Sequence, residues 1–257
     1  AGSKSKIKDK IINKLFCPVN FQYREPFLGS ASICLSLLPS NIWINDIDAG
    51  IASLWTSVIQ YPKELKSFIL NFEPTIENFY EFKTELLIAD KMPLEKMDII
   101  ETGFKKLAIH QMSYSGLGVK SGVLGGIAQK SKYKINCRWN AETLCNKVDK
   151  INKQLEKVKI RENCCTNLDF IDVIEDDSCQ ACIYADPVYV HKGNQLYKHG
   201  FTLKDHKRLC EALKKTKHKW VLSYDDCEEI RELYGWASIN EISISYTVTS
   251  KRNTTEL

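Results

Sequence analysis

An apolar run that ends in Asp-Pro constrains the fold of this chain more than any other stretch. Residues 181–185, Ala-Cys-Ile-Tyr-Ala, predict a short buried strand because no polar side chain interrupts them. Pro187 has no N–H with which to continue strand pairing, so Asp186 stands at the carboxyl end of that strand. In open α/β sheets ligands bind at this edge, which makes Asp186 a candidate active-site residue. An ordinary β-turn, in which Asp and Pro are favoured, is the alternative.

A second strand and turn are predicted near the start of the chain. Residues 23–29 read as a strand that ends in Gly29, a residue without Cβ that suits a tight turn close to a ligand. Ser30 is the expected N-cap of a helix over residues 31–38. Residues 42–44 form the next predicted strand, and Asp46 stands at its end.

Three motifs together resemble those of the N6-adenine DNA methyltransferases. They are Tyr-Arg-Glu-Pro-Phe-Leu-Gly-Ser-Ala-Ser at 23–32, Asn-Asp-Ile-Asp at 45–48 and Asp-Pro-Val-Tyr at 186–189. Their order resembles the D12 class, alpha group, in which the cofactor motif precedes the target-recognition region and the catalytic tetrapeptide follows it. The resemblance covers nearly the whole chain and implies transfer of a methyl group to adenine N6 in a specific DNA sequence.

The resemblance also implies a domain organisation. The expected fold is α/β, a Rossmann-like S-adenosylmethionine-dependent methyltransferase sheet with helices on both faces and an inserted, mostly helical target-recognition domain. Residues 1–60 and 158–257 would form the catalytic domain, and residues 61–157 the insertion. Apolar residues at helical spacing over 61–110 agree with a helical insertion.

The residues themselves also indicate a cofactor. An acid such as Asp46 can accept two hydrogen bonds from a ribose diol, which would also suit a dinucleotide enzyme. The turn at 29–32 lacks the three-glycine spacing that seats a pyrophosphate, so S-adenosylmethionine fits better. The family's usual second glycine falls at Ala31, a mild departure. The resemblance implies these cofactor-binding residues: Lys4, Phe27, Gly29, Asp46, Asp169, Phe170 and Asp186. From the sequence alone, Asp169 could equally be a helix N-cap.

The tetrapeptide at 186–189 accounts for the expected chemistry. The lone pair of an adenine amino nitrogen is delocalised into the ring. The site must therefore accept a hydrogen bond from each of the two amino N–H groups, so that the lone pair is exposed to the methyl donor. Asp186 carboxylate and the Pro187 carbonyl are the matching acceptors, and Tyr189 offers a face for the base, which must be flipped out of a duplex. The family usually has a second proline where this chain has Val188, which leaves the turn less rigid. Both acceptors survive the change, so activity is expected, whether or not it is reduced.

A basic segment supplies the expected DNA contacts. Residues 103–164 hold thirteen lysines and arginines against four acidic residues, whereas the whole chain has a net charge of only +4. A solvated charged face is the alternative, but the segment surrounds a polar, glycine-rich loop that can lie along phosphates. The candidate nucleic-acid-binding residues are Tyr114, Ser115, Lys120, Lys130, Lys132, Lys134 and Arg138.

Local patterns predict further helices and a wall for the base pocket. Asn140 is a natural N-cap for a helix over residues 141–158, and Thr202 with Asp205 predicts a capped helix through Lys215. Leu-Ser-Tyr at 222–224 resembles the family segment that walls the base pocket. His199 and His206 are interpreted as loop and helix residues rather than catalytic bases.

Composition limits the remaining classes of protein to which the chain could belong. No apolar run reaches the roughly 18 residues of a membrane helix, and we expect a cytoplasmic protein, monomeric in solution, without a membrane partner. The ten cysteines are expected to be reduced thiols. Cys179-Gln-Ala-Cys182 stands without a second ligand pair, so no metal is expected. Double-stranded DNA is the expected partner, with a cognate restriction endonuclease as a further one. A catalytically weak or inactive, cofactor-binding DNA-recognition protein and an RNA N6-adenine methyltransferase remain the alternative functions.

Overall fold

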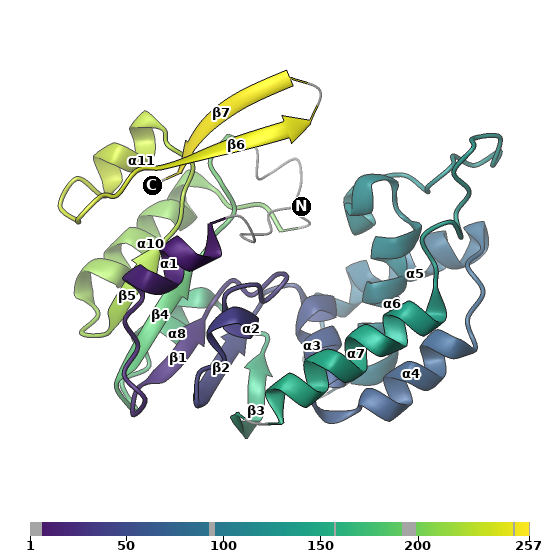
Figure 1. Cartoon of the computed structure of the whole chain (residues 1–257), viewed down its shortest axis with the longest axis horizontal. Helices are drawn as coiled ribbons and strands as arrows, with labels where there is room; N and C mark the ends of the chain where they lie inside the picture. The colour runs from purple at the N-terminus through teal and green to yellow at the C-terminus, as the bar shows by residue number, and fades with distance from the viewer. Residues whose placement is uncertain (1–6, 93–95, 157, 192–198, 249, 257) are drawn as a thin grey trace.

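The computed structural model describes residues 7–92, 96–156, 158–191, 199–248 and 250–256. Its centre is a sheet of five parallel strands in the order β3-β2-β1-β4-β5 (Figure 1). The strands are β1 (Gln22–Glu25), β2 (Asn41–Asn45), β3 (Lys159–Thr166), β4 (Ala181–Ala185) and β5 (Lys219–Leu222). The expected α/β fold is therefore confirmed, and β4 has the bounds that the apolar run predicted.

Helices and a hairpin complete the described chain. The α-helices are α1 (Lys8–Lys14), α2 (Cys34–Leu37), α3 (Ala49–Gln60), α4 (Pro62–Leu70), α5 (Ile76–Ala89), α6 (Ile99–Met112), α7 (Ala141–Leu155), α8 (Phe170–Glu175), α10 (Leu203–Lys215) and α11 (Glu228–Leu233). Two 3₁₀ turns, η2 (Tyr114–Gly116) and η3 (Gly118–Lys120), follow α6. The hairpin of β6 (Ile242–Val248) and β7 (Ser250–Glu256) is a separate antiparallel sheet.

Side chains of the central strands alternate between two cores. Cys182 and Tyr184 of β4 pack with Ile11 of α1 on one face of the sheet. Ile183 packs with Leu209 of α10 on the other face, together with residues of α8 and α11. This alternation is the period of two that a strand imposes. Helices therefore cover both faces, as expected.

The order of the strands fixes where a ligand can bind. The chain leaves β1 for β2 on one side and leaves β4 for β5 on the other, although β1 and β4 are neighbours. The segments after these two strands consequently diverge at the carboxyl edge of the sheet. This topological switch point is the usual ligand site of open α/β sheets.

Helices α3 to α7 form a group of their own beside β3 (Figure 1). Their shared core includes Leu65, Phe79 and Phe104. Phe72 and Trp139 pack against this core, and the centroids of their two rings are 5.0 Å apart. Val58 of α3 also lies in this core, so the helical group begins before residue 61. The division of the chain into domains at 61–157 stays a prediction.

The caps predicted at Asn140 and Thr202 were confirmed, whereas the cap and helix predicted after the first turn were wrong. Asn140 accepts from Thr143 N–H at 2.8 Å, and Thr202 and Asp205 form the predicted capping box. The helix expected over 31–38 is only Cys34–Leu37, and Ser30 does not cap it. Ala31 has a φ of 52°, a left-handed conformation that no helix can include. Helix α7 also ends at Leu155, three residues before the predicted end.

Candidate active site

The ends of all five parallel strands meet at one edge of the sheet. Registers such as Glu25 with Ile44 and Ala185 with Leu222 align the strands, so the segments that follow them lie side by side. This edge therefore collects the predicted site residues that follow β1 to β4: Phe27, Gly29, Asp46, Asp169, Phe170, Asp186, Pro187 and Tyr189. Lys4 lies outside the described residues, and its role stays a prediction.

Asp46 holds the turn after β1. Its Oδ2 accepts from the backbone N–H of Gly29 at 2.9 Å, and its Oδ1 accepts from the N–H of Asp48 at 2.9 Å. Gly29 has a φ of 49°, in which a side chain would be strained, and its carbonyl accepts from Trp55 Nε1 at 3.0 Å. Desolvation, with Asp48 nearby, raises the pKa of Asp46 to about 6.

Asn45, which sequence reasoning missed, joins three strand ends. It is fully buried, and its Nδ2 donates to the carbonyls of Pro26 at 3.1 Å and Leu168 at 3.0 Å. Its Oδ1 accepts from Leu168 N–H at 2.9 Å and from Thr166 Oγ1 at 2.7 Å. One amide thus fixes the segments after β1 and β3 relative to β2. A polar residue closing an apolar strand was the available sequence signal.

Glu25 is a second residue that sequence reasoning missed. It ends β1 with 3% of its surface exposed, and its Oε2 accepts from Tyr23 Oη at 2.7 Å and from Cys34 N–H at 3.3 Å. Burial raises its pKa to about 8, and the charges of Asp186 and Asp46 contribute to the rise. Two further carboxyl groups therefore lie within electrostatic range of Glu25, which stays protonated at neutral pH.

The Asp-Pro turn leads into a pair of neighbouring tyrosine rings. Asp186 is half-buried and Pro187 is buried. The ring of Tyr189 lies 6.1 Å from that of Tyr224, centroid to centroid. The Oη of Tyr224 and Nδ1 of His206 are 2.6 Å apart, and burial lowers the pKa of this histidine, so it is neutral. His206 is a helix residue as expected, and it also holds Tyr224 in place.

Three phenylalanine rings from the segments after β1, β3 and β4 form a cluster. Phe27 lies 5.3 Å from Phe170 and 5.7 Å from Phe201, centroid to centroid. The guanidinium of Arg208 stands 5.1 Å from the Phe170 centroid and donates to Asp169 Oδ1 at 3.0 Å. Asp169 also caps α8 through Ile171 N–H, as the alternative interpretation expected. Arg208 therefore covers the ring of Phe170, one of the residues that the resemblance places in the cofactor site.

The comparison with known families shows which family the chain belongs to. A sequence model of the D12 class N6 adenine-specific DNA methyltransferases matches residues 1–248. The chain belongs to this family. No curated protein matches it. The family acts on adenine in DNA, which agrees with an acidic turn and aromatic rings at one sheet edge. In the described part of this methyltransferase no helix is long and apolar enough to cross a membrane.

The predicted DNA-contacting residues of this methyltransferase lie on the helical group, between α6 and α7. Tyr114, Ser115 and Lys120 belong to the two 3₁₀ turns, and their side chains are exposed. Lys130, Lys132, Lys134 and Arg138 are also exposed. The structure gathers these residues on one loop, apart from the sheet edge.

Backbone contacts hold this loop of the methyltransferase in shape. Arg138 Nη2 donates to the Ser113 carbonyl at 3.0 Å, and His110 Nδ1 lies 2.8 Å from the Gly116 carbonyl. Burial lowers the pKa of His110 to about 4, so the ring is neutral and Nδ1 carries the proton that it donates. Arg138 thus has a structural contact in addition to its predicted contact with DNA.

A buried ion pair connects the loop-bearing helix to the sheet edge. Lys106 Nζ of α6 lies 2.6 Å from Asp48 Oδ2, and both side chains are almost completely buried. Asp48 also caps α3 by accepting from Ile51 N–H at 3.1 Å. Each charge would be costly to bury alone, so the pair fixes α6 relative to the Asp46 turn.

Proposed function

We propose that this methyltransferase transfers a methyl group from S-adenosylmethionine to the N6 amino group of adenine in a specific sequence of double-stranded DNA, with the target base flipped out of the helix. The observation that carries the proposal is the position of Asp186 at the switch point, in electrostatic range of Glu25 beside the Gly29–Asp46 turn. A nucleoside cofactor and a base can approach such an edge from two neighbouring strand ends.

Asp46 fits the ribose of this cofactor. Its pKa of about 6 leaves it ionised at neutral pH, and it is only partly buried. Each carboxylate oxygen has a second lone pair beyond the one that accepts from Gly29 or Asp48, so the ribose hydroxyls can donate to it. Gly29 presents open space, since a Cβ built there would meet no atom within 4 Å.

The adenine of the cofactor fits beside Phe27, Phe170 and Asp169 once the side chain of Arg208 has moved. Both contacts of Asp169 are made by Oδ1, which leaves Oδ2 for an adenine amino N–H. Phe170 is 7% exposed and Arg208 covers it, whereas Phe27 is half-buried. Arg208 is 39% exposed and can turn toward solvent, which opens Phe170 to the adenine ring.

Asp186 and Pro187 would prepare the target amino group. The carboxylate of Asp186 and the carbonyl of Pro187 each accept one N–H, so the nitrogen lone pair is directed at the methyl donor. The negative charge of Asp186 also offsets the positive charge that develops on the nitrogen. When bound, S-adenosylmethionine supplies an electrophilic methyl group on a positively charged sulfur. The protein thus contributes position and electrostatics.

Tyr189 would stack on the flipped base. Its ring packs toward Tyr224, and Tyr224 is held by His206. A ring that is fixed in this way loses little freedom when a base stacks on it. Val188 follows Pro187 and packs with the core of α8 and α10, so the turn is supported although the family's second proline is missing.

The exposed lysines of the loop between α6 and α7 would bind DNA phosphates. Such contacts fix the register of the protein on the duplex and depend on salt. Tyr114 is 65% exposed on the same loop and can reach base edges or unstacked bases. The recognition sequence would be determined by this loop rather than by the sheet edge.

Transfer of a tritiated methyl group tests the proposal. Purified protein is incubated with labelled S-adenosylmethionine and unmethylated DNA, RNA or no nucleic acid. Label is expected in N6-methyladenine of DNA and at one sequence context, identified by nuclease digestion and sequencing. Label in RNA alone would replace DNA by RNA as the substrate. Cofactor and DNA binding without transfer would identify a catalytically inactive recognition protein and overturn the proposal.

A further inference from the structure

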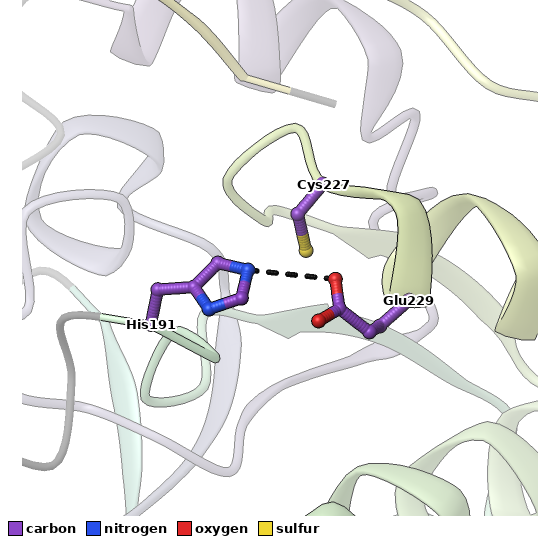
Figure 2. A group of neighbouring side chains, drawn as sticks. All are labelled: His191, Cys227 and Glu229. Carbon is purple, nitrogen blue, oxygen red and sulfur yellow. Dashed lines mark ion pairs between the residues drawn. The ribbon is translucent and has the colours of Figure 1, made fainter.

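Three side chains with metal-binding atoms converge beside the Asp-Pro turn. Figure 2 shows the imidazole of His191, the thiol of Cys227 and the carboxylate of Glu229 directed toward one another. His191 Nε2 lies 3.4 Å from Glu229 Oε2, and one ligand atom from each residue lies within 4.8 Å of the other two. His191 comes two residues after Tyr189, whereas Cys227 and Glu229 belong to the start of α11.

The spacing of these atoms is close to that of a zinc site. Zinc binds His nitrogen and carboxylate oxygen at about 2.0–2.2 Å and Cys sulfur at about 2.3 Å, so tetrahedral ligands stand roughly 3.3–3.8 Å apart. The His191–Glu229 distance already falls in that range. The remaining distances reach at most 4.8 Å, so the atoms need to move inward by only about 1 Å. Exposed side chains such as His191 make shifts of this size by small rotations.

The types of ligand select the metal. Magnesium and calcium take oxygen ligands, and this cluster offers a single carboxylate. A nitrogen, a sulfur and an oxygen donor together suit a borderline ion such as zinc. We propose that His191, Cys227 and Glu229 form a Zn²⁺ site with three protein ligands and an open fourth position for water. The Cys-x-x-Cys motif at 179–182 contributes no ligand to this site. No local signal in the sequence indicates the site, because His191 and Cys227 are 36 residues apart.

A bound ion would connect two parts of the fold that carry the proposed base pocket. His191 continues the segment that contains Tyr189, and α11 follows the segment that contains Tyr224. Zinc would cross-link these segments and so stabilise the folded chain against heat, since a ligand that binds only the folded state shifts the unfolding equilibrium. The site does not depend on the proposed methyl transfer.

Binding of Zn²⁺ and Co²⁺ to the tag-free protein tests this inference. Calorimetry is expected to give one zinc per chain, and cobalt is expected to produce the absorption band of a thiolate-to-cobalt charge transfer. Cys227→Ser should abolish that band. Zinc binding should weaken at least about tenfold in each of the variants Cys227→Ser, His191→Gln and Glu229→Gln. Even the loss of a residue that only hydrogen-bonds to a metal ligand can weaken metal binding this much. Serine suits the N-cap position of Cys227, so this variant should fold.

Cys137→Ser is the matched control, because Cys137 is an exposed thiol outside the cluster. It should leave the cobalt band and zinc affinity unchanged. Circular dichroism of each metal-free variant shows whether the fold is kept, and zinc should raise the melting temperature of the wild type but not of Cys227→Ser. The absence of the cobalt band from the wild type, or its persistence in Cys227→Ser, would overturn the proposal.

Discussion

The carboxylate of Asp46 accepts a hydrogen bond from the backbone N–H of Gly29 at 2.9 Å. Asp46 follows β2 and Gly29 lies in the turn after β1, so this contact holds together the two segments that would bind the ribose. The same carboxylate accepts from Asp48, whose side chain pairs with Lys106 of the loop-bearing helix α6. The proposed cofactor site and the proposed DNA-binding loop are thus connected through two neighbouring acids.

Removing this carboxylate should weaken cofactor binding. Hydrogen bonds to a charged group contribute about 1.5–3 kcal/mol, so Asp46→Ala should raise the Kd for S-adenosylmethionine by roughly 10- to 100-fold. Isothermal titration calorimetry measures the change. Glu142→Ala, an exposed acid on α7, is the control and should bind normally. Wild-type affinity in the Asp46 variant would show that Asp46 does not bind the ribose.

Glu25 should make stability depend on pH. Its pKa is about 8 in the folded protein, against an ordinary value of 4.5 for an exposed glutamate, so between these values the folded state keeps a proton that the unfolded state releases. The free energy of unfolding should therefore fall as pH rises from about 4.5 to 8. Glu25→Gln mimics the protonated form and should be more stable than the wild type at pH 8, on the order of a few kcal/mol.

Urea unfolding at pH 5, 6.5 and 8 measures this effect. The two proteins should be nearly equal at pH 5 and separate as pH rises, because glutamine still accepts from Tyr23 Oη and does not titrate. The other acidic groups titrate in the same way in both proteins. The difference between the two free energies of unfolding therefore reports on Glu25 alone. Parallel curves would show that Glu25 is ionised in the folded state.

Arg208 should compete with the cofactor. It pairs with Asp169 and covers Phe170, and a partly exposed ion pair of this kind is worth up to about 1 kcal/mol. Arg208→Ala should consequently lower the Kd for S-adenosylmethionine by up to about fivefold in calorimetry. Arg231→Ala, which removes another exposed arginine with two acidic partners, should have no effect. A Kd raised tenfold in Arg208→Ala would mean that the guanidinium itself binds the cofactor.

Strands β2 and β4 and the turns after them were predictable because their signals are local, whereas β1 ends at Glu25, four residues before its predicted end. An apolar run before Asp186, a glycine in the turn after β1 and an acid after β2 each lie within a few residues. Asn45 acts on Leu168, 123 residues away, and Arg208 acts on Asp169, 39 residues away. Contacts between distant residues leave no periodic pattern in a single sequence.

The helix over 31–38 was predicted wrongly for a conformational reason. Ala31 lies at a φ of 52°, so the turn continues past Gly29 and the helix starts only at Cys34. An alanine in this region costs roughly 1–2 kcal/mol relative to a regular conformation. The replacement of the family's glycine by Ala31 is therefore less mild than its small side chain indicated.

Three lysines of the loop should account for much of the salt dependence of DNA binding. Lys130, Lys132 and Lys134 are exposed, and replacing all three by glutamine should flatten the slope of log K against log salt by about 2 to 3 units if each contacts a phosphate. Fluorescence anisotropy over a salt series measures it. Replacing Lys214, Lys215 and Lys217, exposed lysines just before β5, is the matched control. Equal slopes in the two triple variants would assign the loop lysines to a solvated face.

The rate of methyl transfer by Asp186 variants tests the central claim most directly. Loss of an oriented, charged acceptor costs about 3 kcal/mol or more, so Asp186→Ala should lower kcat by about 100-fold or more while DNA affinity changes little. Asp186→Asn should be nearly as slow, because the amide lacks the charge that offsets the one developing on the nitrogen. If Asp186→Ala methylates adenine in DNA at the wild-type rate, the tetrapeptide at 186–189 is an ordinary turn and the mechanism proposed for this site is wrong.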